Sequence, residues 1–347
     1  MNTTLSSKNR IVSLDIIRGF ALLGILFINI PAYQVTVEGM ASNTNYSAID
    51  EMVDVLISIF ITKKFFSIFS FLFGIGFYIF TSRVEARGDN PRRRFTRRLL
   101  SLLFIGILHF FIFWGTILPV YALIGFLLLP FYNANLSTIS KWLGGISFIY
   151  LVAIMVQFFI PEQSIVKSIS SDSTLIFIMF LAGFGVAKAK WIENIGEIKE
   201  QIKRIQLITL PLFIGGSVWI WIASHSNNEQ LTLIISLSSI PTVIFYLSTM
   251  FLLLENKKVI TLFSPVAFVG RMALTNYVAQ SLIATVIMSF MNIEAVTPIQ
   301  TVWIAILIFI IQVIYTSIWF KFFKMGPLEK LWRFMTYGKR KTQPIQG

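Results

Sequence analysis

The sequence predicts an all-α fold, a polytopic membrane bundle of roughly ten spanning helices. Hydrophobic residues make up 56% of the 347 residues and charged residues only 13%, whereas soluble domains are about 25% charged. Apolar runs extend along the whole chain, so residues 1–347 are predicted to form a single integral membrane domain. Lys and Arg gather in short clusters between these runs, as RRRFTRR at residues 92–98 shows, which is typical of cytoplasmic loops.

Composition also excludes several classes of function. The net charge of +13 suggests nucleic-acid binding at first sight, but no recognition motif accompanies it, so the expected partner is the lipid bilayer and not nucleic acid. The absence of cysteine excludes disulfides and thiolate nucleophiles, and the two histidines lie too far apart in sequence to suggest a metal site. The first apolar run lacks an A-x-A cleavage pattern, so we expect the mature protein to retain it.

The first predicted span, Ile11 to Pro31, contains three groups that lipid does not tolerate alone: Asp15, Arg18 and Asn29. Asp15 and Arg18 are three residues apart and therefore share one helical face. An internal salt bridge that fixes helix packing is the simpler interpretation of this pair, and binding of an anion is the alternative. Either way, the first helix predicts a polar interior around which the other helices pack.

After an acidic loop, residues 49–62 show apolar positions at helical spacing with acids on the opposite face. This pattern predicts an amphipathic helix at the outer surface. Lys63 and Lys64 follow on the outer side, against the usual distribution of positive charge. They are interpreted either as snorkelling residues at a helix end or as ligands for an anionic group.

The remaining chain is predicted to alternate between outer turns and basic cytoplasmic loops, with both termini in the cytoplasm. The expected spans after the first are Phe65–Ser82, Leu99–Trp114, Ile117–Phe131, Trp142–Ile160, Thr174–Ala187, Ile205–Ala223, Leu231–Leu254, a ninth ending near Met291, and Ile299–Phe323. Residues 325–347 are predicted to be an amphipathic, basic tail on the cytoplasmic surface. Repeated G-x-G in FLFGIGF and FLAGFGV indicates close helix packing or duplicated halves.

Polar residues inside the apolar spans are the candidate site residues. Near the cytoplasmic side, Arg18 and Arg271 could clamp a phosphate or carboxylate between their guanidinium groups, with Asn276 and Tyr277 in the same segment as Arg271. His109 lies eleven residues beyond Arg98, or about 16 Å along the helix axis, in the outer half of the bilayer. A histidine there suits a general base, and a structural hydrogen bond is the alternative.

Five ordered motifs carry a family resemblance: SLDIIRGFALLGILFIN, KKFFSIFSFLFGIGF, RRLLSLLFIGILHFFIFWGTILPVYALIG, GRMALTNYVAQS and GPLEKLWRFMTYG. In this order they resemble the bacterial YeiB-type membrane proteins, domain-of-unknown-function family 418. The L-D-x-x-R-G opening is also similar to transmembrane acyltransferases of the heparan-alpha-glucosaminide N-acetyltransferase kind. Where the YeiB pattern has H…W-x-G-D-I-L, this chain has Thr116 at the place of the acid.

The resemblance implies transfer of an acyl group from cytoplasmic acyl-CoA to an acceptor on the far side of the membrane. No tightly bound cofactor is implied, and acyl-CoA would be a co-substrate. The residues expected to carry catalysis are His109, Asn29 and Asp15. The residues expected to bind substrate are Arg18, Lys63, Lys64, Arg271, Asn276 and Tyr277.

Two other functions are consistent with the same polar residues. A transporter or exporter of a small anionic or amphiphilic solute would use Arg18, Arg271 and Lys64 as successive anion contacts. A non-catalytic scaffold would use all of these groups for packing. In each case a multi-pass protein of the bacterial plasma membrane is expected, and the sequence leaves open whether it is a homodimer.

Overall fold

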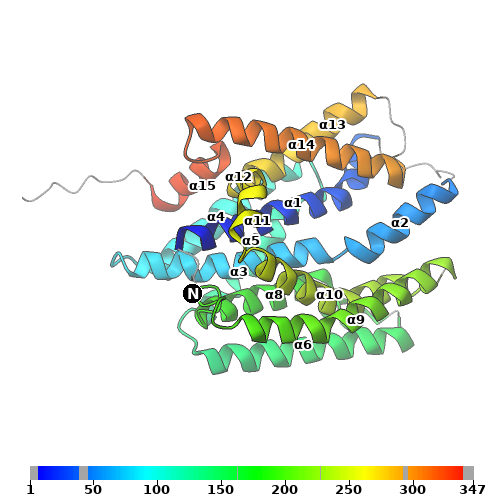
Figure 1. The fold of residues 1–347 in the computed structure, drawn as a ribbon, viewed down its shortest axis with the longest axis horizontal. Helices are drawn as coiled ribbons and strands as arrows, with labels where there is room; N and C mark the ends of the chain where they lie inside the picture. The colour runs from blue at the N-terminus through cyan, green and yellow to red at the C-terminus, as the bar shows by residue number, and fades with distance from the viewer. Residues whose placement is uncertain (1–6, 39–45, 162, 227, 292–295, 339–347) are drawn as a thin grey trace, which may run out of the picture.

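The computed structural model describes residues 7–38, 46–161, 163–226, 228–291 and 296–338 (Figure 1). The side chains of Lys8 and Arg10, which contribute to the predicted topology, lie outside the described part, as does the tail beyond residue 338. All regular elements within the described ranges are helices. The expectation of an all-α membrane protein is therefore confirmed.

The helices follow one another with short connections. Those of the first half are α1 (Ser7–Glu38), α2 (Ala48–Phe60), α3 (Lys64–Glu85), α4 (Pro91–Phe110), α5 (Leu118–Phe126), the 3₁₀ turn η1 (Leu129–Phe131), α6 (Leu136–Phe159), α7 (Ser164–Ile169) and α8 (Asp172–Lys188). Those of the second half are α9 (Lys199–His225), α10 (Leu231–Leu253), α11 (Lys257–Leu262), α12 (Ser264–Arg271), α13 (Ala273–Phe290), α14 (Pro298–Phe322) and α15 (Pro327–Tyr337).

Eight helical stretches of the described chain are long and apolar enough to cross a membrane. The sequence predicts roughly ten because residues 99–114 and 117–131 each contain an apolar run. The first of these is the apolar part of α4, whose opening turns are strongly basic. The second is the nine-residue α5 and a 3₁₀ turn. Nine helical residues extend only about 14 Å, less than half of the hydrocarbon thickness.

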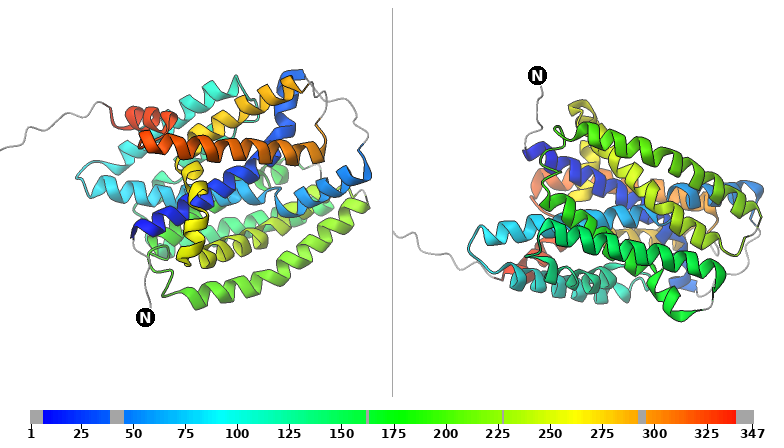
Figure 2. Two further views of the ribbon diagram at one scale, coloured as in Figure 1. Left: turned by 45° about the horizontal axis from the view of Figure 1, so that its top comes forward. Right: turned by 90° about the horizontal axis from the view of Figure 1, so that it is seen from below.

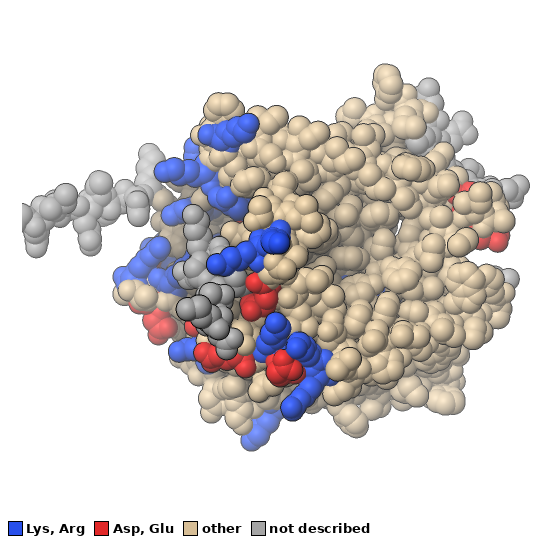
Figure 3. Space-filling model, viewed as in Figure 1, with Lys and Arg blue, Asp and Glu red and all other residues tan. Residues whose placement is uncertain are grey.

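The long helices run roughly parallel to one axis, and Figures 1 and 2 show the described start of α1 and the helix α15 at the same end of the bundle. Lys and Arg side chains gather at that end (Figure 3), which is called the basic end below. Acidic side chains lie among them, whereas the opposite end, where α2 begins, shows acidic side chains without Lys or Arg in this view. This gathering of Lys and Arg at one end is typical of a membrane protein whose basic end faces the cytoplasm.

The first helix occupies the centre of the bundle. Of its most apolar stretch, 61% is buried inside the protein, whereas the corresponding figure for α9 is 11%. Helices α6 and α9 instead expose large apolar side chains, such as Phe148 at 68% and Ile208 at 66%. Such surfaces suit hydrocarbon, so α1 carries its polar groups into the interior, while α6 and α9 face lipid.

The repeated G-x-G segments bring α3 and α8 into close contact. A β-carbon on Gly74 would lie 2.0 Å from the Phe180 carbonyl oxygen, and one on Gly183 would lie 1.9 Å from the Phe71 carbonyl oxygen. Only glycine permits two helix backbones to approach this closely. The packing interpretation of these segments thus has a direct structural basis.

Helices α2 and α3 form one apolar stretch with a break between them. Ser47 and Asp50 form a capping box that starts α2, and the stretch turns at Lys63, whose φ is +67°. Helix α2 covers most of the segment for which the sequence predicts an amphipathic helix, and it packs against α9 and α14. The break places Lys63 and Lys64 beside the outer ends of the neighbouring helices.

Candidate functional site

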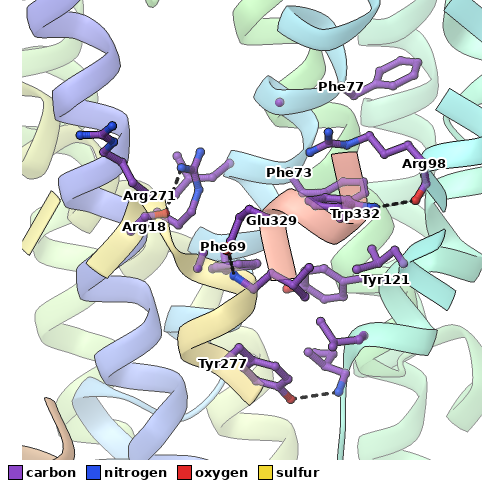
Figure 4. Close-up of a pocket in the computed structure, with 18 of the residues that line it drawn as sticks. Arg18, Phe69, Phe73, Phe77, Arg98, Tyr121, Arg271, Tyr277, Glu329 and Trp332 are labelled. Atoms are coloured by element: carbon purple, nitrogen blue, oxygen red, sulfur yellow. Dashed lines mark hydrogen bonds between the residues drawn. The ribbon is translucent and has the colours of Figure 1, made fainter. Parts of the chain in front are cut away.

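A cavity of about 250 Å³, with a largely apolar lining that also carries several charged groups, lies toward the basic end of the bundle and is called the inner pocket (Figure 4). Its charged and aromatic lining residues come from seven helices and include Arg18, Arg98, Arg271, Tyr277, Glu329 and Trp332. Three guanidinium groups, against the Glu329 carboxylate in the lining and the Asp15 carboxylate paired with Arg18, give the pocket a net positive charge. Such a pocket suits an anionic ligand.

Helix α1 contributes an ion pair to the wall of this pocket. Arg18 Nη1 donates to Asp15 Oδ1 at 2.6 Å and to the Gly270 carbonyl oxygen at 3.3 Å. Gly270 makes this possible because its α-carbon lies against the α1 backbone: a β-carbon there would be 1.9 Å from the Asp15 carbonyl oxygen. Asp15 therefore orients Arg18, and both interpretations of the pair, packing and anion binding, remain compatible with the geometry.

Helix α12 places Arg271 beside the same pocket. The Arg271 guanidinium lies 4.2 Å from the centre of the Phe320 ring. An aromatic ring supports a cation without neutralising its charge. The structure therefore brings Arg18 and Arg271 to one pocket, as the sequence suggested.

A third arginine, Arg98, completes the inner pocket. Its guanidinium stacks 3.6 Å from the Trp332 ring centre, and Trp332 Nε1 donates to the Arg98 carbonyl oxygen at 2.8 Å. The sequence assigned Arg98 only to the topological cluster at residues 92–98. Arg98 lies four residues after Arg94, at the point where α4 becomes apolar. This position on the same helical face is the signal that could have singled it out.

Helix α15 closes the pocket at the basic end. Glu329 Oε1 accepts hydrogen bonds from the Leu274 and Thr275 amides at 2.7 and 3.1 Å, and so caps the start of α13. Arg94 holds the other end of α15 by donating to the Tyr337 carbonyl oxygen. Its Nε also donates to Asp89 at 2.5 Å, and this hydrogen bond lowers the pKa of the Asp89 carboxyl.

A second cavity, the outer pocket, has a volume of about 200 Å³ and lies farther from the basic end. Its polar lining residues are Asn29, Lys63, Thr116 and Tyr277. The inner and outer pockets share three lining residues, Ile25, Ile117 and Tyr277. These three residues, called the partition below, separate an arginine-rich cavity from one lined by neutral polar groups and one lysine.

His109 lies directly behind the outer pocket. Its Nδ1 is 2.8 Å from Thr116 Oγ1 and its Nε2 is 2.9 Å from Ser281 Oγ. The imidazole is buried, with 2% exposed, and its ring centre is 5.4 Å from that of Tyr277. His109 lines neither pocket, so it reaches the outer pocket through the Thr116 hydroxyl. The position that differs from the family pattern thus still supplies a hydrogen-bond partner to the histidine.

Asn29 and Tyr277 bring further polar atoms to the outer pocket. The Tyr277 hydroxyl accepts a hydrogen bond from the Ile117 amide at 3.1 Å, and Asn29 lies next to this hydroxyl. The Asn29 Nδ2 and the Tyr33 hydroxyl are buried without a hydrogen bond to any described residue. An unused buried donor is costly, and a ligand oxygen in the outer pocket would satisfy that of Asn29.

The other expected site residues have structural partners. Lys63 lines the outer pocket but pairs with Asp172 at 2.7 Å. Lys64 is fully buried, donates to the Ser58 carbonyl oxygen at 2.7 Å and lines neither pocket. Asn276 lines neither pocket either: its Nδ2 donates to the Val269 carbonyl oxygen at 2.9 Å. Lys64 and Asn276 thus hold helices in place.

Comparison with known proteins gives a consistent set of relatives. The family model described as "Protein of unknown function (DUF418)" matches residues 186–339. An uncharacterized 39.9 kDa protein in the amylase 3′ region of Bacillus acidopullulyticus is 32% identical over 95% of both chains. The uncharacterized protein YxaH of Bacillus subtilis is 29% identical over 95% of both chains, and the uncharacterized protein YeiB of Escherichia coli is 26% identical over 94% of this chain and 96% of its own. No solved structure matches.

Proposed function

We propose a function from the premise that this chain belongs to the DUF418 family of YeiB-type membrane proteins. The proposed function is that of a transmembrane acyltransferase. The protein would take an acyl group from an acyl-CoA-type donor in the cytoplasm and deliver it to an acceptor on the far side. In this proposal the protein spans the bacterial plasma membrane several times, with the basic end and both termini in the cytoplasm. The donor and the acceptor are substrates, and the reaction needs no tightly bound cofactor.

One observation carries the proposal: the inner and outer pockets meet at the partition formed by Ile25, Ile117 and Tyr277. The inner pocket offers three arginines near the basic end, where a negatively charged donor would arrive. The outer pocket offers hydrogen-bond donors and a hydroxyl bonded to a histidine. A reactive carbonyl held at the partition would face both sets of groups.

The inner pocket supplies the affinity for the donor. Arg18, Arg98 and Arg271 would contact phosphate oxygens, for which the planar guanidinium is well suited. A cavity of about 250 Å³ is near the lower limit of ligand pockets, so only the pantetheine and diphosphate part of the donor would enter, and its nucleotide would remain outside.

The outer pocket supplies the chemistry. An acceptor oxygen or nitrogen bonds to the acyl carbon, and the carbon–sulfur bond of the thioester breaks. The acceptor proton passes through the Thr116 hydroxyl to His109 Nδ1, which are 2.8 Å apart. His109 then gives up this proton, and the departing thiolate takes up one proton to leave as free CoA. The Asn29 Nδ2 and the Tyr277 hydroxyl would donate to the carbonyl oxygen as its negative charge develops.

The test is a titration of the purified protein in nanodiscs with acetyl-CoA, and calorimetry measures the binding. Arg18→Ala and Arg271→Ala should each weaken binding by about tenfold or more, because each removes a hydrogen bond between charged groups. Arg87→Ala is the matched control, since Arg87 is exposed at the same end and lines neither pocket. An intact protein that binds no acetyl-CoA would contradict the proposal.

Transport of a small anionic solute is the second candidate, and a specific observation favours it. His109 lines neither pocket, and both of its ring nitrogens already have hydrogen-bonding partners. Two cavities that share a three-residue partition also suit alternating access. If His109→Gln leaves the function of the cell intact while the arginine variants abolish it, transport becomes the better account.

A further inference from the structure

A third cavity lies beside α1 and adjoins the outer pocket. This lateral groove has a volume of about 480 Å³ and lies between α1, the α2–α3 break and α10. Its lining is almost entirely apolar and includes Phe20, Phe27, Phe60, Tyr246, Met250 and Leu253. Phe60 is 42% exposed and Leu253 is 54% exposed, so the groove is accessible from the hydrocarbon of the bilayer.

The polar atoms within the groove are occupied by the protein itself. The Tyr246 hydroxyl donates to the Phe60 carbonyl oxygen at 3.3 Å, and Thr249 Oγ1 donates to the Phe245 carbonyl oxygen at 2.8 Å. None of the described residues that line the groove is charged. An occupant therefore finds apolar contacts there, as an aliphatic chain requires.

The lateral groove and the outer pocket share Gly24, Ile61 and Phe65 in their walls. The Phe65 ring lies against the α1 backbone: a β-carbon on Gly24 would be 2.0 Å from this ring. Phe65 therefore stands, together with Ile61 and the α1 backbone at Gly24, between the apolar groove and the outer pocket.

The direction of the groove matches a lipid of the outer leaflet. Helix α10 runs toward the basic end, so Leu253 marks the end of the groove nearer the cytoplasm, and the shared residues lie farther from that end. A lipid tail would extend from the outer pocket toward the middle of the bilayer, and its headgroup would meet Asn29, Thr116 and Lys63. Lys63 provides a cation for a headgroup phosphate, which would replace Asp172 as its ion-pair partner.

We propose that the acceptor is a membrane phospholipid whose headgroup carries a hydroxyl or an amine, with its tail in the lateral groove and its headgroup in the outer pocket. This inference rests on the proposed function for the reaction, but the lipid site itself is independent of it. The acceptor would reach the site sideways through the membrane, while the donor would bind from the cytoplasm. In the transfer, the headgroup oxygen or nitrogen forms the new bond to the acyl carbon and the thioester carbon–sulfur bond breaks.

Photocrosslinking tests the site without any need for activity. A benzophenone amino acid replaces Phe27 in the groove or, as the control, Phe148 on the lipid-facing side of α6. In nanodiscs of phosphatidylcholine, phosphatidylethanolamine and phosphatidylglycerol in equal parts, adducts at position 27 should be enriched in one of the latter two lipids. Adducts at position 148 should follow the bulk composition.

A blocking variant makes the same experiment specific. Met250→Trp fills the groove and should abolish the enrichment at position 27, and Leu253→Trp at the exposed rim is the alternative if the first variant does not fold. The inference would be overturned if the adducts at position 27 followed the bulk lipid composition and persisted in the blocking variants.

Activity then separates the two proposals. With acetyl-CoA labelled in the acetyl group, the label should appear in the chloroform-soluble lipid fraction. Release of free CoA with the label only in water-soluble acceptors would refute a lipid acceptor and leave acyl transfer standing. If no CoA is released although the crosslinks are enriched, the lipid site stands and the acyltransferase proposal fails.

Discussion

The inner and outer pockets differ in how their polar groups are held. In the inner pocket the arginines rest on aromatic rings, a backbone carbonyl and one carboxylate, as Arg98 on Trp332 and Arg18 on Asp15 show. In the outer pocket most groups are neutral, and one buried donor, Asn29 Nδ2, has no partner among the described residues. The first arrangement keeps positive charge available for a ligand, whereas the second keeps hydrogen-bonding capacity available for a reacting group.

Thr116 distinguishes the two pockets most sharply, because it belongs to the outer one alone. Thr116→Val removes the hydroxyl that connects His109 to the outer pocket while preserving side-chain shape. The rate of acyl transfer should fall by about 100-fold or more, the usual loss when general-base catalysis is removed. Binding of acetyl-CoA should not change.

Thr116→Ser is the matched control for this comparison, since it restores the hydroxyl and should recover most of the rate. The measurement is release of free CoA at saturating donor. Equal rates for the Val and Ser variants would show that the His109–Thr116 contact plays no part in the reaction.

Arg98 provides the corresponding test of the inner pocket. Arg98→Ala should raise the dissociation constant for acetyl-CoA by about tenfold to 100-fold, since a hydrogen bond to a charged group contributes about 1.5–3 kcal/mol. Arg98→Lys should recover only part of the affinity, because an ammonium cannot stack on Trp332 as a flat guanidinium does. Calorimetry in nanodiscs measures both. Unchanged affinity in both variants would remove Arg98 from the site.

The contact between α1 and α12 tests whether the inner pocket depends on helix packing. Gly270→Ala forces the Asp15 carbonyl away and should destabilise the fold by about 1–3 kcal/mol, the usual cost of overpacking. Donor binding should weaken too, since Arg271 follows Gly270 directly. Gly144→Ala on α6 is the control, because a β-carbon there meets no atom within 4 Å. Equal thermal unfolding temperatures for the two variants would contradict a close contact between α1 and α12 at Gly270.

A smaller effect is expected at the Lys63–Asp172 pair beside the outer pocket. Asp172 is half exposed, with 53% of its side chain accessible, so the pair contributes about 0–1 kcal/mol to stability. Asp172→Asn should therefore shift thermal unfolding little, but it should strengthen lipid enrichment at position 27 by freeing Lys63. Weaker enrichment would argue that the pair itself recognises the headgroup.

The smallest effect concerns pH at the basic end, where Arg94 contacts both Asp89 and α15. The folded-state pKa of Asp89 is lowered by its hydrogen bond from Arg94, so this contact stabilises the protein above the ordinary carboxyl pKa near 3.9. The contribution is lost as the pH falls through the lowered value and is constant around neutrality. Asp89→Asn should make thermal unfolding less sensitive to pH in the acidic range alone. Equal pH sensitivity in the unmodified protein and in Asp89→Asn would contradict a stabilising role of the Asp89–Arg94 contact.

The sequence predicted the polar side chains of single helices better than their partners. Asp15 and Arg18 could be paired because they are three residues apart, and Arg271 was singled out because no acid lies near it in sequence. The contact between Arg98 and Trp332 joins residues far apart in the chain, and helical periodicity contains no information on such a pair. For the same reason α15 suggested a surface helix, although Glu329 lies in the inner pocket.

The outer pocket shows a second limit of sequence reasoning. Two adjacent lysines suggested either snorkelling at a helix end or one anion site, but Lys63 lines the outer pocket and Lys64 is buried against the Ser58 carbonyl. The break between α2 and α3 turns these neighbours in different directions, and nothing in their spacing reveals it. Thr116 likewise suggested the loss of a partner for His109, whereas its hydroxyl occupies that role at 2.8 Å.

The central claim, that donor and acceptor meet across the partition, is tested most directly with doubly labelled acetyl-CoA sealed inside proteoliposomes. One label marks the acetyl group and the other marks the adenine. The account predicts that the acetyl label appears on acceptors accessible from outside, while the adenine label remains inside with free CoA. Appearance of both labels outside, or of neither, would contradict acyl transfer through the two pockets.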